Sequence, residues 1–346
     1  MNPGSLQIGA YGEPQLLLLA LLAYSRDTAR DNARVIRNLQ RLSLSDHQWL
    51  GEAFPLADSI KNGISLNQDF FNNLVRNRAL VADFQVNAFP ESLAPEELLP
   101  YSMRVRQLLS AVAREWSLNG ELERKQCFGL ISDFVKKYLP SDSSILLPGA
   151  SLGRLAHELA ALDHTVTAVE DDMLKSLAYR FLQNGFSAEI SPYILNTCNR
   201  REPDDNAVSL TVPENPDILK LPVSYVMDDF FAWATEDSER KFDAIVTSFF
   251  IDACETSIAQ LCRIFQILLK QGGVWINVGS LTYSYEGDVR KEGKIYEASA
   301  EEVLMVAGKC GFEVLEHGFV KTTYAANPRS LMYSEHDALF FVARKI

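Results

Sequence analysis

The stretch Ser144–Arg154 constrains the fold more than any other part of the chain. Ile145–Leu147 is a short apolar run of the kind that forms a fully buried parallel strand. Gly149 and Gly153 bracket a tight loop, and a helical pattern of apolar residues follows them. A glycine turn between a strand and a helix lets a ligand lie against backbone N–H groups at the helix N-terminus.

An acidic residue follows the glycine turn at the spacing of a nucleotide-binding unit. The next apolar strand, Thr165–Val169, ends on Glu170. In a Rossmann-type unit an acid about twenty positions after the glycines binds the ribose hydroxyls. The pair therefore predicts a nucleotide site, and the alternative is an ordinary strand–turn–helix with a surface glutamate.

From Ser144 onward, strand and helix patterns alternate. Such alternation predicts an α/β fold, a doubly wound and mostly parallel Rossmann-like sheet, whose ligands lie beyond the carboxyl ends of the strands. Residues 190–220 are rich in Pro and Asn, and we interpret them as an irregular insertion. The residues that we expect at the carboxyl ends are Gly149, Glu170, Asp229, Phe230, Ser248 and Asp252.

Helical patterns fill the chain before the sheet. We predict a helical N-terminal region over residues 1–100 and a catalytic domain over 101–346, with a helical lead-in at 101–140 and the sheet at 144–346. The apolar run Leu16–Ala23 is too short to span a bilayer, and no Lys or Arg precedes it. We therefore expect a buried helix there. A linker is predicted at Pro90, Pro95 and Pro100.

The composition limits the partners. With a net charge of -12 and a pI near 5.0, the chain is expected to bind neither nucleic acid nor a membrane. A small-molecule or peptide substrate is expected instead, and a homodimer is left open. The five cysteines form no C-x-x-C pair and the histidines are scattered, so we predict no metal site and a reduced, cytoplasmic or nuclear compartment.

The spacing of the motifs separates two kinds of nucleotide. The turn reads Gly-x-x-x-Gly rather than G-x-G-x-x-G, which favours S-adenosylmethionine over NAD. Asp229 followed by Phe230 suits an adenine, because the carboxylate can accept from the exocyclic amine while the ring packs on the base. The helix–Lys-Gln-Gly-Gly–strand unit at Leu268–Val278 is typical of class I methyltransferases. A NAD-linked oxidoreductase and a catalytically silent binding module stay open.

From about Val105 to Arg344 the chain resembles the carnosine N-methyltransferase family, and the first hundred residues resemble it only loosely. The segments that carry the resemblance are Arg114–Ser117, Pro148–Ala156, Asp229–Phe230, Phe249–Ala253 and Gly272–Gly279. The resemblance implies an S-adenosylmethionine-dependent N-methyltransferase, with Ser248 in place of a family Cys that lines the cofactor site. The residues that it implies for binding the cofactor are Arg114, Gly149, Gly153, Glu170, Asp229, Phe230 and Ser248.

On the acceptor side, the resemblance implies that Asp252 orients an imidazole and acts in catalysis. The alternative is that Asp252 is the N-cap of a helix that begins near Cys254. Tyr283 is followed by Ser284, where the family has His, and the family's tyrosines near the last strand are absent. We therefore expect a small peptide, imidazole or amine substrate, with carnosine itself turned over poorly and a peptide natural product as the alternative acceptor. The residues expected to bind the substrate are Asp252, Tyr283, Ser284, Tyr324 and His336.

Overall fold

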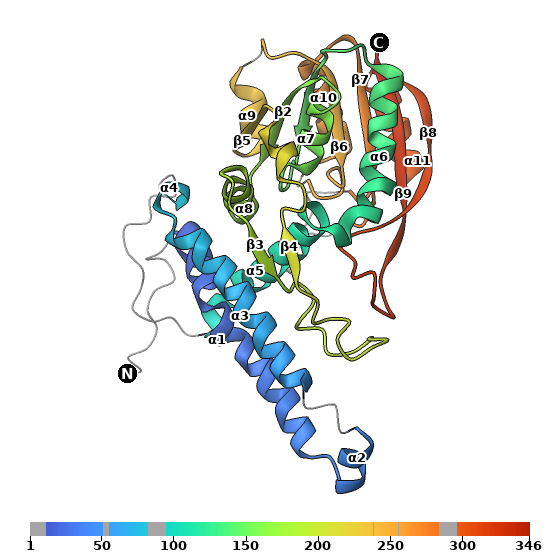
Figure 1. Cartoon of the computed structure of the whole chain (residues 1–346). Coiled ribbons are helices and arrows are strands. Elements are labelled where there is room, and N and C mark those ends of the chain that lie inside the picture. The colour runs from blue at the N-terminus through green and yellow to red at the C-terminus, as the bar shows by residue number, and fades with distance from the viewer. Residues whose placement is uncertain (1–11, 51–54, 82–94, 238, 255, 284–295) are drawn as a thin grey trace, which may run out of the picture. The chain divides into compact units, whose positions relative to one another are not determined.

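The computed structural model of this chain contains a seven-stranded sheet (Figure 1). The strands stand in the order β5-β2-β1-β6-β7-β9-β8. Neighbours from β5 through β7 are parallel, whereas β9 pairs antiparallel with both β7 and β8. The predicted doubly wound, mostly parallel sheet is confirmed. The strands are β1 (Ser144–Pro148), β2 (Thr165–Glu170), β5 (Val223–Met227), β6 (Phe242–Ser248), β7 (Leu269–Gly279), β8 (Phe312–Thr323) and β9 (Glu335–Lys345).

The structure describes residues 12–50, 55–81, 95–237, 239–254, 256–283 and 296–346. Their contacts divide the chain into two compact units. The first comprises Met1–Asn119, Met173–Glu214 and Ala325–Tyr333. The second comprises Gly120–Asp172, Asn215–Tyr324 and Ser334–Ile346, and it contains the seven-stranded sheet. The boundary expected at residue 100 stays a prediction.

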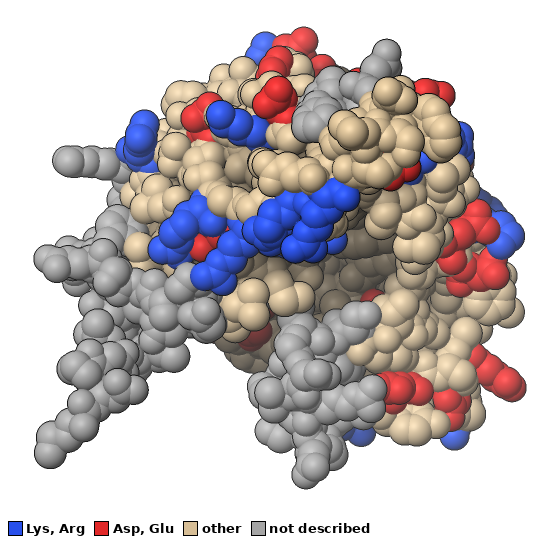
Figure 2. Space-filling model, turned by 90° about the horizontal axis from the view of Figure 1, so that it is seen from below, with Lys and Arg blue, Asp and Glu red and all other residues tan. Residues whose placement is uncertain are grey.

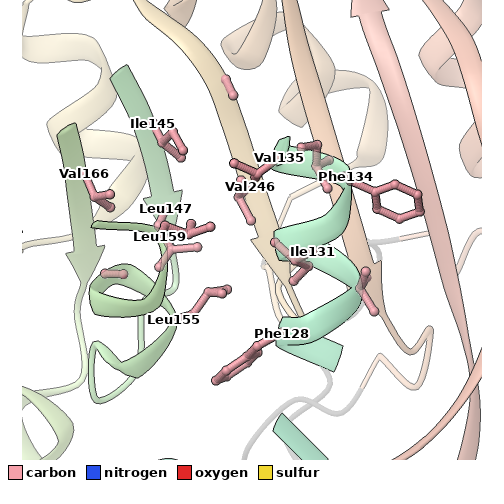
Figure 3. Packing of buried hydrophobic residues seen from close by; sticks show 14 of the residues in the cluster. Phe128, Ile131, Phe134, Val135, Ile145, Leu147, Leu155, Leu159, Val166 and Val246 are labelled. Carbon is pink, nitrogen blue, oxygen red and sulfur yellow. The ribbon is translucent and has the colours of Figure 1, made fainter. Parts of the chain in front are cut away.

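Both faces of the sheet are covered by helices. Alternate residues of β1 point to opposite faces, so Ile145 and Leu147 enter one core cluster and Leu146 enters the other. Figure 3 shows the first cluster, where Ile131 and Val135 of α6 approach the sheet. A strand that buries both faces must be apolar throughout, as the run Ile145–Leu147 is. The helices of this unit are α6 (Glu121–Tyr138), α7 (Arg154–Ala160), α9 (Phe230–Glu236), α10 (Ile258–Leu268), α11 (Ala300–Lys309) and the 3-10 helix η4 (Pro216–Lys220).

Helices also make up most of the first unit, where α1 packs on α3 and α5. The buried residues of α1 include Leu17, Leu18 and Leu21, so the buried helix expected at Leu16–Ala23 is confirmed. No helix in the described ranges is both long and apolar enough to cross a membrane. The elements are α1 (Glu13–Gln40), α2 (Leu44–Trp49), α3 (Pro55–Arg76), α4 (Arg78–Val81), α5 (Pro95–Trp116), η3 (Leu118–Gly120, at the boundary), α8 (Met173–Gln183), β3 (Ala188–Ile190) and β4 (Leu210–Val212).

Two local expectations were wrong. Pro95 and Pro100 lie in α5 and not in a linker, whereas Pro90 lies outside the described residues. Pro95 begins the helix, where no backbone N–H is needed, and packing of the α5 residues that follow maintains the helix past Pro100. Residues 190–220 are not wholly irregular, since β4 pairs antiparallel with β3 and η4 follows. These strands are three residues each, too short for their sequence pattern to identify.

Candidate methyltransferase site

The glycine turn after β1 adopts backbone conformations that few residues tolerate. Gly149, Ser151 and Gly153 have φ angles of 64°, 50° and 75°, all in the left-handed region. A Cβ atom on Gly149 would come within 2.5 Å of a Phe250 ring carbon. Gly153 is the N-cap of α7, so the turn delivers the chain directly into that helix. The strand–turn–helix unit predicted from the sequence is confirmed.

Glu170, at the end of β2, lies against this turn. Its side chain is buried, with one carboxylate oxygen accepting from Ser151 N at 2.7 Å and the other from Asp172 N at 3.0 Å. The Tyr225 hydroxyl donates to Ser151 O at 2.6 Å from the neighbouring strand β5. A carboxylate has about four lone-pair sites, so it can accept from ligand hydroxyls in addition to these donors. The structure thus brings the predicted turn and the predicted acid together.

Asp229 and Phe230 lie where β5 ends and α9 begins. Asp229 is the exposed N-cap of α9, and its Oδ1 accepts from Ala232 N at 2.7 Å. Its other oxygen has no hydrogen-bond partner among the described residues, so it can accept from a ligand donor. The Phe230 ring is 5% exposed and packs edge-on to Phe250 and Phe265, with centroids 5.6 Å and 6.0 Å away. Stacking of this ring on a base therefore stays a prediction.

Asp252 is a buried carboxylate in the loop after β6, and one of its two oxygens accepts all of its hydrogen bonds from the described residues. Oδ2 accepts from Ser280 Oγ at 2.9 Å, from Thr282 N at 2.9 Å and from Thr282 Oγ1 at 3.0 Å. Within the described ranges, Oδ1 receives no hydrogen bond. The N-cap interpretation was wrong, because α10 begins at Ile258 and is capped by Ser257. One oxygen of Asp252 is thus held in place and the other is available.

At the same edge of the sheet lies Phe249, which the sequence marked only as part of a family segment and not as a site residue. Phe249, the residue after β6, has a φ of 51°, and its ring centroid lies 4.8 Å from Tyr324 and 6.3 Å from His336. It thus brings together two predicted substrate residues. The available signal was its position at a strand end, next to the predicted Ser248. Tyr283 donates its hydroxyl to Ala298 O at 2.7 Å, and Ser284 lies outside the described residues.

Two cysteines lie near these residues. The buried Cys127 sulfur lies 3.5 Å from Ser248 Oγ, which directs this hydroxyl toward α6. Cys254 follows Asp252 closely and donates to Phe250 O at 3.1 Å. Burial, with the negative charge of Asp252 adding to it, raises the pKa of the Cys254 thiol. A thiol held protonated is a poor nucleophile, so Cys254 is unsuited to compete with a methyl acceptor.

Arg114 belongs to the first unit, where it lies buried on α5 with Nη1 3.6 Å from Glu115 Oε1. Its predicted contact with the methionine carboxylate of the cofactor therefore stays a prediction. In the described part of the chain, no three His, Cys, Asp or Glu side chains are grouped so as to hold a metal ion.

Two features define a Rossmann-like methyltransferase. The antiparallel strand β9 is inserted between β7 and β8, and Glu170 contacts the glycine turn at the carboxyl edge of the sheet. The family described as carnosine N-methyltransferase matches residues 97–346. The carnosine N-methyltransferase of Schizosaccharomyces pombe is 27% identical over 96% of this chain and 97% of its own length. That of Rattus norvegicus is 31% identical, over 88% of this chain and 79% of its own. This chain belongs to the carnosine N-methyltransferase family, and it is an S-adenosylmethionine-dependent methyltransferase.

Solved structures align at lower similarity. An S-adenosylmethionine-dependent methyltransferase from Methanosarcina mazei is 14% identical, over 62% of this chain and 97% of its own, with a TM-score of 0.38. A likeness this distant says nothing about the substrate.

Proposed function

We propose that this protein transfers the methyl group of S-adenosylmethionine to an imidazole nitrogen of a small carnosine-like peptide. The observation that carries the proposal is Asp252, a buried carboxylate with Oδ2 held by Ser280 and Thr282 and Oδ1 available. It lies just beyond the carboxyl end of β6, where an open α/β sheet binds its ligands. The relatives named carnosine N-methyltransferases support the same substrate class.

The residues of the donor side fit S-adenosylmethionine. Glu170 and Asp229 are the carboxylates that can accept from ribose hydroxyls and from an adenine amine. S-adenosylmethionine, when bound, supplies a methyl group already activated by its sulfonium. The protein therefore mainly has to align the acceptor and keep it unprotonated. Arg114 is proposed to bind the methionine carboxylate, since a guanidinium matches a carboxylate bidentately.

Asp252 can select the reactive form of an imidazole. A neutral imidazole has one N–H group and one lone-pair nitrogen. Oδ1 accepts from the N–H, which leaves the other nitrogen directed at the methyl group. That lone pair forms the new N–C bond while the C–S bond breaks, and the proton on the first nitrogen is then released. For an amine acceptor, the same carboxylate would orient the ammonium group and take its proton.

The test measures methyl transfer from labelled S-adenosylmethionine to carnosine, to other histidyl dipeptides and to a simple amine. Asp252→Asn should lower turnover by about 100-fold or more, the scale of a lost acid–base group. Binding of S-adenosylhomocysteine, measured by calorimetry, should be unchanged. Asp337→Asn is the control, because Asp337 is an exposed carboxylate on β9 that pairs with Lys321 at the surface. Donor binding without transfer to any acceptor would instead identify a silent binding module.

Selectivity for carnosine itself is a separate test. Ser284 stands where the family has His, and a short hydroxyl can neither stack on an imidazole nor titrate near neutral pH. Removing polar contacts from a site reduces recognition more than removing a methylene does. We therefore expect Ser284→His to raise turnover of carnosine relative to other dipeptides. Efficient carnosine methylation by the wild type, with Ser284→His neutral, would show that this position does not set selectivity.

A further inference from the structure

A stripe of arginines runs along the exposed face of α1. Within the helix, positions spaced by three or four residues lie on one side, and here the side chains span an arc of about 80° at 100° per residue. All of them are exposed, whereas Leu17, Tyr24 and Val35 on the opposite side are buried. The arginine stripe consists of Arg26, Arg30, Arg34, Arg37 and Arg41.

The arginine stripe is not neutralised by the side chains that the structure describes. Arg26 pairs with Asp27 at 2.9 Å, and the other four have no carboxylate within ion-pairing distance among those side chains. Like charges three and four residues apart repel one another and weaken a helix. Apart from Arg37, whose charge is favourable in the last turn of the helix, the arrangement therefore does not serve the stability of α1. It is also unexpected in a chain whose net charge is -12. Figure 2 shows one face on which Lys and Arg gather in a band.

An apolar patch continues the arginine stripe along the chain. The short helix α2 has no buried residue, and it presents Leu44 and Trp49, which are 86% and 81% exposed. Leu50, the C-cap residue of α2, is exposed as well. The capping box of Ser43 and Asp46 fixes the start of α2 directly after the stripe. Arg and Trp are among the residues that most often dominate protein–protein binding energy.

We propose that the arginine stripe and α2 together form the docking site for an acidic segment of another protein that carries an apolar anchor. Charge complementarity assigns the acidic part to the stripe, and Leu44 and Trp49 take the anchor. From Arg26 to Arg41 the helix rises about 22 Å at 1.5 Å per residue, the span of roughly seven extended residues at 3.3 Å each. A duplex nucleic acid or an anionic membrane presents a far broader surface, which the net charge of -12 would repel.

The test measures fluorescence anisotropy of a labelled Glu-rich peptide that ends in Leu-Leu, with the full chain. The triple variant Arg30→Gln/Arg34→Gln/Arg37→Gln should weaken binding at least about tenfold. The matched control is Lys136→Gln/Arg263→Gln/Lys309→Gln, which removes the same charge from exposed helix positions of the second unit and should change binding less than about twofold. Methyl transfer to a small dipeptide should be equal in all three proteins.

Trp49→Ala tests the apolar part of the site. It should weaken binding of the peptide that ends in Leu-Leu and leave binding of a Glu-only peptide unchanged, since only the first peptide carries the apolar anchor. Equal binding of the peptide to wild type and stripe variant, or no binding to either, would overturn the proposal. So would stripe-dependent binding of single-stranded oligothymidylate or of phosphatidylserine vesicles without peptide binding, because the partner would then be a nucleic acid or a membrane.

Discussion

At the scale of single residues, hydrogen bonds from nearby loops hold the carboxylates of this site. Glu170 accepts from the glycine turn and from Asp172, and Asp252 accepts from the loop after β7. Both are buried. A buried carboxylate with directed donors keeps one orientation, and pre-organised groups of this kind contribute more to binding than mobile ones do.

Glu170 is expected to contribute to donor affinity. Glu170→Gln keeps the size of the side chain but removes the charge and one acceptor oxygen. We predict that it weakens S-adenosylmethionine binding by about 1–3 kcal/mol, the range for a hydrogen bond to a charged group. Calorimetry with wild type and variant measures the difference, with circular dichroism as the check on folding. Unchanged affinity would remove Glu170 from the donor site.

Thr282 is expected to act on turnover by orienting Asp252. Thr282→Val keeps the shape and the backbone N–H but removes the Oγ1 donor to Asp252. We predict a kcat reduced by about tenfold with donor KM unchanged, since a bond to a charged group contributes 1.5–3 kcal/mol. Thr282→Ser retains the hydroxyl and should retain most of the activity. If the valine and serine variants behave alike, the hydroxyl does not position Asp252.

His157 on α7 should make the stability depend on pH. Its ring is fully buried, and burial, together with the nearby Arg154 charge, lowers its pKa from 6.5 to about 4. The unfolded chain therefore takes up a proton between pH 6.5 and 4 that the folded chain does not, so stability falls as the pH drops through this window. We predict a loss of up to about 3 kcal/mol in the free energy of unfolding. Denaturant titrations at several pH values should show a shallower fall in His157→Gln, and an equal slope would contradict this origin.

At the scale of elements, the loops after β6 and β7 pack closely. The register pairs Ser248 with Val278, and Phe249 N donates to Val278 O at 3.0 Å. A Cβ atom on Gly279 would lie 2.8 Å from Phe249 N and 2.9 Å from its Cα. Both are backbone atoms, so neither can move without shifting the strand ends that carry Asp252 and Thr282.

Gly279→Ala should therefore damage both stability and activity. We predict a loss of about 1–3 kcal/mol in the free energy of unfolding, the scale of overpacking in a filled core. Gly308→Ala is the matched control, because Gly308 lies in α11 with open space around its Cα. Alanine there should stabilise the protein by about 0.5–1 kcal/mol through its helix propensity. Equal stability of the two variants in urea titrations would show that the loops relax around the added methyl group.

At the scale of the whole molecule, the first unit is built from three separate stretches of the chain. Phe181 of α8 packs on Phe70 of α3, with centroids 5.7 Å apart. The buried Asn67 side chain accepts from Ser191 N at 2.7 Å and donates to Ser191 O at 2.9 Å, which ties α3 to the end of β3. Helix α8 and strand β3, which follow β2 in the chain, are thus anchored on the helix α3.

A chain that begins at Gly120 should lose order in residues 173–214. It would lack α3 and α5, which supply the buried partners of α8 and β3. We predict fast amide hydrogen exchange and early proteolysis within this range, compared with protection in the full chain. The sheet strands β1 and β6 provide the internal reference. Equal protection of residues 173–214 in both proteins would show that they fold without the N-terminal helices.

The local patterns of the sequence determined the first strands of the sheet in the second unit and its alternation of strand and helix. Apolar runs and the residues that end them predicted β1 and β2, and the helical pattern after the glycine turn predicted α7. These signals are readable because each depends on neighbours within a few residues. The positions of Glu170, Asp229 and Asp252 at strand ends followed from the same patterns.

The partners of those residues were decided only by the tertiary structure. Asp252 meets Ser280 and Thr282 across 28 and 30 positions, because the parallel register of β6 and β7 brings their following loops together. Phe249 contacts Tyr324 and His336 in the same way. Pairing of β9 with both β7 and β8 brings these two residues to the end of β6. A strand's own residues specify which of its faces is buried, whereas its neighbour and register depend on the whole sheet. The sequence therefore determined which side chains reach the edge of the sheet, and strand pairing decided which of them touch.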